Sequence, residues 1–252
     1  SAKSYIESSR KKIAEILNCE TSEIIFNSGG TESDNSLLRC SVKDLGIKTI
    51  ISSKIEHHAI THTLDELEKE GVEVKYVNIN EKGEIDYDHL QKLLSENNDL
   101  KLVTLMYVNN EIGNILDINK VSDLCRNNNS LFHTDAVQAV GHFKIDLKET
   151  QIDFLSAAGH KFHGPKGVGF SFIRKTSRLS PFICGGPQER GLRAGTESVH
   201  NIVGMTKALE VSYEKINEET KYITSIKEYA INELKSIFPK IHFNGLAGNL
   251  EK

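Results

Sequence analysis

The stretch Ile24-Ile25-Phe26-Asn27-Ser28-Gly29-Gly30-Thr31-Glu32-Ser33-Asp34-Asn35-Ser36-Leu37-Leu38 predicts a short apolar strand, a Ser/Gly turn and the start of a helix. A helical pattern over 2–18 precedes it. Further strand candidates follow at 49–51, 72–77, 102–107, 131–133, 152–155 and 168–173, with helical patterns between most of the earlier ones. Short apolar strands that alternate with helices are typical of a sheet covered on both faces, so the sequence predicts a three-layer α/β fold with a mainly parallel sheet.

The last part of the chain follows a different pattern. A helical stretch over 202–237, predicted in two pieces, precedes a strand candidate at 240–245 that enters a turn. We therefore expect a large domain over 1–212. We expect 213–252 to form a connecting helix and the beginning of a smaller C-terminal α+β domain.

Composition narrows the class of protein. The 252 residues carry a net charge of −4 without a long block of one sign, which gives no reason to expect nucleic acid or an anionic membrane as the main partner. The longest apolar runs are strand-sized, below the roughly 20 residues of a membrane span, and no secretory leader opens the chain. Four scattered cysteines without a CxxC pair favour reduced thiols. We expect a soluble, cytoplasmic protein.

The Ser/Gly turn at 28–33 is a candidate phosphate site. Glycines let the backbone approach an anion, and the N-terminus of the following helix offers free N–H groups and a favourable dipole. The alternative is an ordinary capping box in which Thr31 and Asp34 satisfy the helix N-terminus.

A carboxylate lies at the end of the strand that begins at Leu131. Asp135 and, one helical turn later, Gln138 can face the same ligand there. A carboxylate beside the pyridine nitrogen of pyridoxal phosphate (PLP) keeps that nitrogen protonated, and an amide can bind the ring hydroxyl. The alternative for Asp135 is a helix N-cap.

Lys161 follows the strand at 152–155 and is flanked by Gly159 and by Gly164-Pro165. Such a turn would hold the amine in place rather than in solvent. An amine with a lowered pKa is suited to Schiff-base chemistry. The alternative is a solvated surface lysine.

Six motifs resemble, in order, the motif set of NifS/IscS-type cysteine desulfurases, which are class V members of the fold type I PLP-dependent enzymes. They are NSGGTESDN at 27–35, EHHA at 56–59, VNNEIG at 108–113, HTDAVQ at 133–138, GHKFHGPKG at 159–167 and GGPQERGLRAGTE at 185–197. The resemblance implies the three-layer, mainly parallel, seven-stranded type of sheet found in that fold.

The resemblance also implies roles for individual residues. Lys161 would form the internal Schiff base with PLP, and Asp135 would pair with the pyridine nitrogen. His57 would stack on the ring and assist proton transfer. The other residues implied at the cofactor are Gln138 and Asn110 beside the ring hydroxyl, Gly30, Thr31 and His160 at the phosphate, Ala158 where the family usually has a phosphate-binding serine, and Thr196, which would reach the phosphate of the neighbouring subunit in a homodimer.

The activity implied by the resemblance is L-cysteine desulfuration, which yields alanine and a protein persulfide. The sulfur would pass to an acceptor protein such as an iron–sulfur cluster scaffold, or to tRNA thiolation. Alternatives are another class V reaction, such as selenocysteine lysis or aminotransfer, and a truncated dimerising homologue without catalysis. We predict that Lys161→Ala abolishes the visible imine absorbance.

Three further groups of residues depart from the family or have rival interpretations. None of Cys19, Cys40, Cys125 and Cys184 matches the family's nucleophilic cysteine, so none is nominated; that cysteine and the substrate-binding arginine would lie beyond Lys252, in a longer protein. No metal site is predicted, because the i,i+4 pair of His58 and His62 lacks an evident third ligand. Arg190 and Arg193 would bind an anion or form salt bridges.

Overall fold

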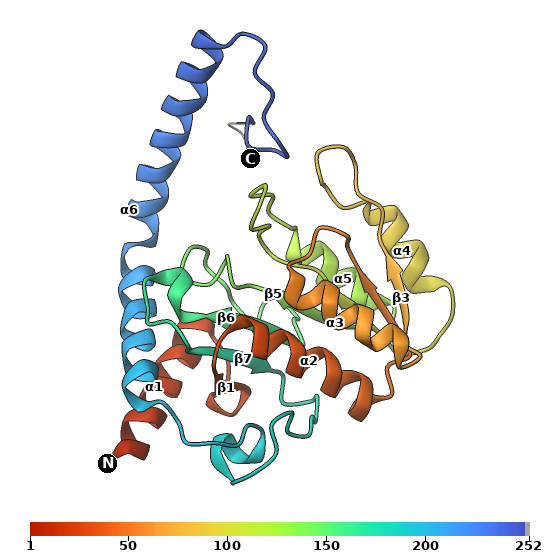
Figure 1. Cartoon of the computed structure of the whole chain (residues 1–252), viewed down its shortest axis with the longest axis vertical. Helices are drawn as coiled ribbons and strands as arrows, with labels where there is room; N and C mark the ends of the chain where they lie inside the picture. Colours follow the sequence, from red (N-terminus) through yellow and green to blue (C-terminus); the bar gives the residue numbers. More distant parts are fainter. Residues whose placement is uncertain (250–252) are drawn as a thin grey trace.

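The computed structural model describes residues 1–249, and a seven-stranded sheet forms the centre of this part of the chain (Figure 1). The strand order is β1-β7-β6-β5-β4-β2-β3. Only β7 runs antiparallel to its neighbours, while the other neighbouring pairs are parallel. The strands are β1 (Ile24–Asn27), β2 (Thr49–Ser52), β3 (Glu73–Tyr76), β4 (Lys101–Thr104), β5 (Leu131–Asp135), β6 (Phe154–Ala158) and β7 (Gly169–Ile173).

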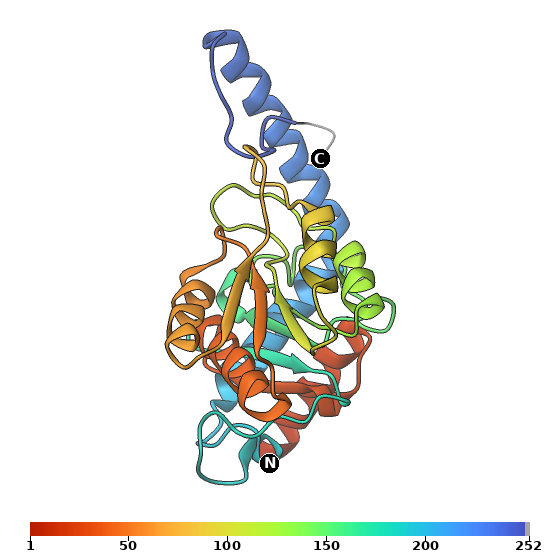
Figure 2. The same cartoon turned by 90° about the vertical axis from the view of Figure 1, so that its right-hand side faces the viewer.

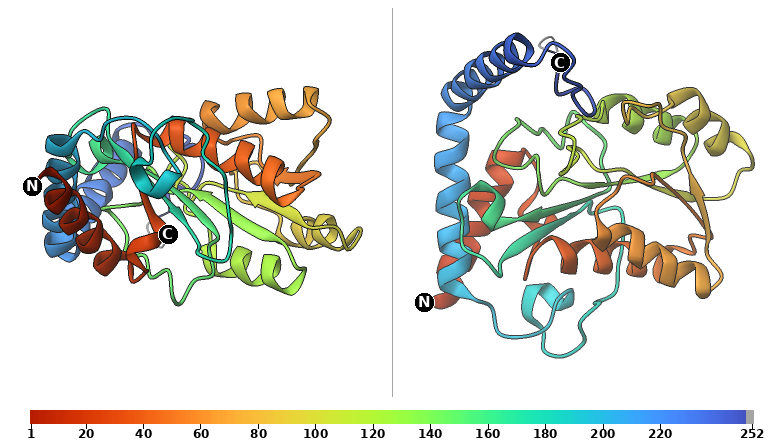
Figure 3. Two further views of the ribbon diagram at one scale, coloured as in Figure 1. Left: turned by 90° about the horizontal axis from the view of Figure 1, so that it is seen from below. Right: turned by 45° about the horizontal axis from the view of Figure 1, so that its top comes forward.

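Helices cover both faces of the sheet (Figure 3). On one face lie α2 (Gly30–Leu45) and α3 (His58–Lys69). On the other lie α1 (Ala2–Leu17), α4 (Tyr87–Ser95), α5 (Ile118–Asn127) and the first half of α6 (Val199–Ile237). Three short 3-10 turns complete the set: η1 (Thr21–Glu23), η2 (Gly159–Phe162) and η3 (Gln188–Gly191).

The side chains of the strands alternate between the two faces. Ile50 and Phe154 pack into the cluster beneath α2 and α3, whereas Ile51 and Leu155 pack into the larger cluster on the other face. This alternation follows from the two-residue period of a strand. The predicted three-layer, mainly parallel α/β fold is confirmed.

The helix α6 is one continuous element of 39 residues, not two pieces as predicted. No proline interrupts it, and its first half is held by buried side chains such as Ile202 and Leu209 that pack beside α1. Its second half projects from the body of the molecule (Figure 2). There Tyr222 and Tyr229 are 66% and 68% exposed.

The predicted strand at 240–245 is wrong. These residues form turns and irregular backbone. A strand needs a neighbour to complete its hydrogen bonds, and residues 1–249 offer no paired neighbour to this segment. The division into domains at 212 and 213 stays a prediction.

None of the helices in residues 1–249 combines the length and the apolar character that crossing a bilayer requires.

Candidate active site

The carboxyl ends of the parallel strands β1, β5 and β6 lie at the same edge of the sheet, where ligands bind in open α/β folds. A cavity of about 250 Å³ opens there, near the lower end of the size range for small-molecule sites. Among the residues that line it are nine of the ten predicted cofactor residues: Gly30, Thr31, His57, Asn110, Asp135, Gln138, Ala158, His160 and Lys161.

The N-terminus of α2 borders this cavity. Gly29 is its N-cap and provides no side-chain cap, so the alternative capping box of Thr31 and Asp34 does not form. The first N–H groups of a helix lack partners within the helix, which makes this end suited to an anion. A Cβ at Gly30 would lie 2.6 Å from Val137 Cγ2, so Gly30 allows α2 to approach the segment after β5 closely.

Asp135 is the last residue of β5 and is buried. The N–H of Val137 donates to its Oδ1 at 2.9 Å. Burial raises the pKa of Asp135, while the Val137 N–H and the electrostatic effects of His57 and Lys161 act in the opposite direction. Residues 137–139 form a turn instead of the predicted helix, so Asp135 is not a helix N-cap; Gln138 still borders the cavity.

Lys161 lies in η2, directly after β6, and is half-buried at the cavity wall. Its carbonyl is 2.9 Å from His142 Nε2, which fixes the backbone of the turn. Burial, together with the charges of Lys161 and Lys166, lowers the pKa of the neighbouring His160. A lowered pKa keeps that ring neutral near pH 7, with one N–H available to a ligand.

His57 is the N-cap of α3. Its Nδ1 accepts the N–H of Ala59 at 3.1 Å. An accepting Nδ1 assigns the neutral ring proton to Nε2, which leaves Nε2 as the nitrogen that can act on a ligand in the cavity.

A loop between β4 and α5 supplies Asn110, whose amide donates to Glu111 Oε1 at 3.0 Å. The preceding residue, Asn109, holds the loop. Its Oδ1 accepts the N–H groups of Glu111 and Ile112, and its Nδ2 donates to the Ile55 carbonyl at 2.8 Å. Asn109 belongs to the VNNEIG motif at 108–113, but the sequence alone assigned it no role.

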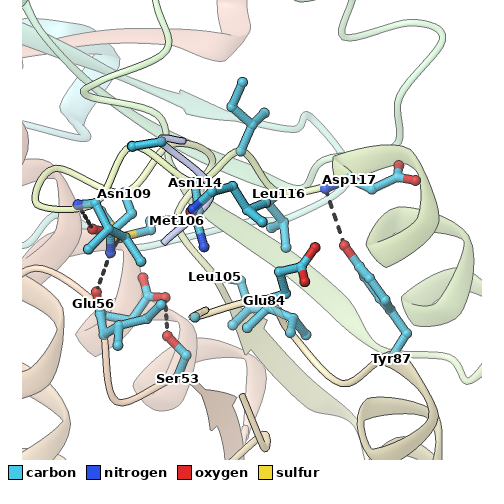
Figure 4. A pocket seen from close by; sticks show the side chains of 18 of the residues that line it. Ser53, Glu56, Glu84, Tyr87, Leu105, Met106, Asn109, Asn114, Leu116 and Asp117 are labelled. Atoms are coloured by element: carbon cyan, nitrogen blue, oxygen red, sulfur yellow. Dashed lines mark hydrogen bonds between the residues drawn. The ribbon is translucent and has the colours of Figure 1, made fainter. Parts of the chain in front are cut away.

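A second cavity, of about 700 Å³, lies beside the first and shares Met106 with it (Figure 4). Glu56 lies at its wall, where Ser53 Oγ donates to Glu56 Oε1 at 2.7 Å. Burial, and secondarily the charge of Asp135, raises the pKa of Glu56 to about 8. Glu56 and Asp34, which also lines the smaller cavity, are buried carboxyls to which the sequence assigned no ligand role.

The remaining predicted residues lie elsewhere. Thr196 is exposed and is not among the residues that line the cavity of its own chain. Arg193 forms a two-bond salt bridge to Glu32, at 2.8 and 3.0 Å, and Arg190 donates to the Thr21 carbonyl. The structure therefore favours structural contacts for both arginines.

The rings of His58 and His62 stack with centroids 4.9 Å apart. In the part of the chain that the structure describes, no group of three or more His, Cys, Asp or Glu side chains could hold a metal ion.

The four cysteines are free thiols in the described residues. Burial raises the pKa of Cys19 to about 12 and that of Cys40 to about 11, and it also raises the pKa of Cys125. A thiol with a raised pKa stays protonated near neutral pH and is therefore a poor nucleophile. Cys184 is exposed and lies outside both cavities.

The donor set of the smaller cavity fits PLP. A carboxylate suits the ring nitrogen, a lysine amine suits the aldehyde carbon, and a helix N-terminus with a neighbouring histidine suits the phosphate. Asp135, Lys161 and Gly30 supply these three features in one cavity.

The chain is similar to several known proteins. A model of the aminotransferase class-V family matches residues 1–250. Cysteine desulfurase IscS of Dictyoglomus turgidum is 42% identical over 246 residues, which cover 97% of this chain and 62% of that protein. Cysteine desulfurase IscS of Methanosarcina thermophila is 44% identical over 247 residues, which cover 97% of this chain and 60% of that protein.

Solved structures agree with the fold. A NifS-like protein superposes with a TM-score of 0.90 at 38% identity, covering 94% of this chain and 66% of that one. DndA from Streptomyces lividans gives a TM-score of 0.86 at 33% identity, covering 93% and 68%.

The chain spans less than two thirds of the length of the two curated relatives. The family model, by contrast, matches nearly every residue of the chain. The chain therefore belongs to the aminotransferase class-V family.

Proposed function

We propose that this chain is the cofactor-binding part of a PLP-dependent L-cysteine desulfurase, which converts L-cysteine to alanine and passes the sulfur on as a protein persulfide. The observation that carries the proposal is the meeting of Asp135, Lys161 and the N-terminus of α2 in one cavity. The names of the relatives, cysteine desulfurase IscS, support the choice of substrate.

The residues of the cavity have distinct tasks in this proposal. Bound PLP supplies a ring that withdraws electrons from the substrate carbon. Asp135 would hold a proton on the ring nitrogen, and Lys161 Nζ would hold the aldehyde carbon in the resting protein. His57, which lines the cavity, would move a proton between the ring face and the substrate.

The phosphate and ring hydroxyl are held by the rest of the set. The N–H groups at Gly30 and Thr31 and the neutral ring of His160 bind the phosphate. Ala158 provides no hydroxyl there, and one lost hydrogen bond to a charged group costs about 1.5 to 3 kcal/mol, which a multidentate site absorbs. Asn110 and Gln138 bind the ring hydroxyl.

The same proposal covers the assembly. Thr196 reaches the phosphate of the neighbouring subunit in a homodimer, and the sulfur goes to an acceptor such as an iron–sulfur cluster scaffold or a tRNA-thiolation protein in the cytoplasm. The exposed apolar side chains of the second half of α6 support a connecting role toward a smaller domain formed in part by 213–252.

A product assay on the protein expressed from its complete gene tests the function. Incubation with PLP, L-cysteine and a thiol should release alanine and sulfide in equal amounts. Lys161→Ala should abolish both, whereas Lys166→Ala, which changes an exposed lysine of the same turn, should retain them. 3-Mercaptopyruvate as the product, alanine from selenocysteine alone, or no product from PLP-loaded protein would contradict the proposal and favour aminotransfer, selenocysteine lysis or a non-catalytic homologue, respectively.

A further inference from the structure

A chain of buried polar side chains crosses the sheet on the face that α2 and α3 cover. Thr104, His133 and Ser156 lie on β4, β5 and β6, and all three are fully buried. His133 Nδ1 lies 2.8 Å from Thr104 Oγ1, and His133 Nε2 lies 3.2 Å from Ser156 Oγ. Asp135 lies two residues beyond His133 on β5 and therefore on the same face.

One arrangement of protons in this hydrogen-bonded row is consistent with these distances. Burial lowers the pKa of His133 to about 3, so its ring is neutral and has one donor and one acceptor nitrogen. When Thr104 donates to Nδ1, the Nε2–H donates to Ser156 Oγ. The hydroxyl proton of Ser156 then remains for Asp34, with which Ser156 interacts.

Asp34 of α2 lies at the end of this row of hydrogen-bonded side chains and at the wall of the smaller cavity. Its side chain is 1% exposed, and its Oδ1 has no hydrogen-bond partner among the described residues. His133 Nε2 is 3.6 Å from that oxygen, too far for a hydrogen bond. An ionised carboxylate in this position would be disfavoured, because the Ser156 hydroxyl alone replaces only part of its lost hydration.

Asp135 has a better environment for a negative charge. It accepts the Val137 N–H at 2.9 Å and is stabilised electrostatically by His57 and Lys161. Burial, followed by the charge of Asp135, raises the pKa of Asp34 well above its ordinary value. Two carboxyls that interact in one buried site do not readily ionise together.

We propose that Asp34 is a positioning residue that stays protonated, closes a chain of neutral hydrogen bonds from Thr104, and leaves Asp135 to carry the negative charge that faces the cofactor ring. The inference rests on the proposed function for the identity of the cofactor. The position of Asp34 on α2 is consistent with this role, because Asp34 lies one turn after Gly30 and faces the same cavity.

Two substitutions of Asp34 separate a neutral carboxyl from an ionised one in the complete protein. Asp34→Asn keeps the shape and the neutral state, so the dissociation constant for PLP should stay within about threefold of wild type, a change of less than one hydrogen bond. Asp34→Ala removes the last member of the hydrogen-bonded row and should weaken PLP binding about tenfold or more. A tenfold loss in Asp34→Asn, or no loss in Asp34→Ala, would overturn the proposal.

Infrared spectroscopy of the cofactor-free protein tests the proton itself. The carbonyl stretching band of a protonated carboxyl should be lost in Asp34→Asn at neutral pH and should remain in Asp135→Asn. Glu56→Gln should remove a separate band and so serves as a matched control. A band lost in Asp135→Asn but kept in Asp34→Asn would overturn the proposal. If wild-type protein fails to bind PLP, the proposed function fails, while the infrared result still decides the state of Asp34.

Discussion

Glu56 is a carboxyl held in the protein interior without a full set of partners. Ser53 donates to one oxygen, whereas Oε2 has no hydrogen-bond partner among residues 1–249. Burial raises its pKa from 4.5 to about 8, and the charge of Asp135 adds to the effect. The folded protein therefore holds a proton on Glu56 that the unfolded chain releases at lower pH.

This difference predicts a pH-dependent stability. The contribution of the Glu56 proton is fully present below pH 4.5 and is lost as the pH rises through about 8. Between these limits the free energy of unfolding should fall by up to about 1.4 kcal/mol per pH unit from this group. Glu56→Gln lacks this loss, so urea unfolding of the cofactor-free protein should show it gaining stability relative to wild type from pH 5 to pH 8.

The control is Glu68→Gln, which changes an exposed carboxyl on α3. Its free energy of unfolding should follow that of wild type over the same pH range. Parallel curves for Glu56→Gln and wild type would show that Glu56 is already ionised in the folded protein.

The sequence predicted most of the residues that line the smaller cavity, but not the buried carboxyls that lie around them. Lys161, Asp135 and Gln138 follow strands in a recognisable order, and the structure brings them into one cavity. The protonation of Glu56 and Asp34 depends on burial by segments distant in sequence, which a single sequence does not display. The roles of Lys161, Asp135 and Gln138 at the cofactor stay predictions.

At the scale of elements, a buried ion pair fastens η3 to α1 and β1. Arg10 binds both carboxylate oxygens of Glu189, at 2.7 and 2.8 Å, and Glu189 also accepts the N–H of Phe26 at 2.8 Å. The two charged side chains are 2% and 1% exposed. Glu189 and Arg190 have positive φ angles of 47° and 57°, a strained backbone that these contacts hold in place.

Removal of one partner should therefore destabilise the protein strongly. Glu189→Ala removes the buried partner of Arg10 and leaves only the half-exposed Glu7 beside its charge, at 3.2 Å, so we expect a loss of up to about 3 to 5 kcal/mol. We expect a lower midpoint of thermal unfolding and faster amide hydrogen exchange over 185–195. The double variant Arg10→Met, Glu189→Leu should recover part of the loss because no buried charge remains.

Lys207→Ala is the control for this pair, since it removes an exposed partner of Glu210 and should change stability by at most about 1 kcal/mol. An effect of Glu189→Ala no larger than that of Lys207→Ala would contradict the anchoring role.

Most elements were predictable because their periodicity is local. The strand candidates before residue 174 and the first helix correspond to observed elements, with shifts at several ends. The continuity of α6 and the irregular backbone at 240–245 were not predicted. Both depend on what lies beside the segment: α6 is fixed by packing on α1, and a strand needs a neighbour.

At the scale of the whole molecule, we predict that the proposed site is complete only in a dimer. Thr196 is exposed and lies outside the cavity of its own chain. An isologous twofold assembly can place such a residue at the site of its partner. The assembly was inferred from the resemblance, and it stays a prediction.

Mixed dimers test that arrangement. Lys161→Ala should be inactive, and Thr196→Ala should lose activity at limiting PLP. Co-expression of the two variants should restore activity at about a quarter of all sites. Half of the randomly paired dimers are mixed, and each mixed dimer has one intact site of two. Restoration requires Thr196 to act on the partner; no recovery in isolated mixed dimers would place its action within its own chain or exclude it.

In the proposed function, Lys161 is the residue that holds PLP. Reduction of the PLP-loaded complete protein with borohydride, followed by peptide mass spectrometry, locates the attachment directly. We predict a single modified lysine, Lys161, and no covalent cofactor in Lys161→Ala. Attachment to Lys166 or to any other lysine, or an unmodified Lys161 in protein that binds PLP, would contradict it.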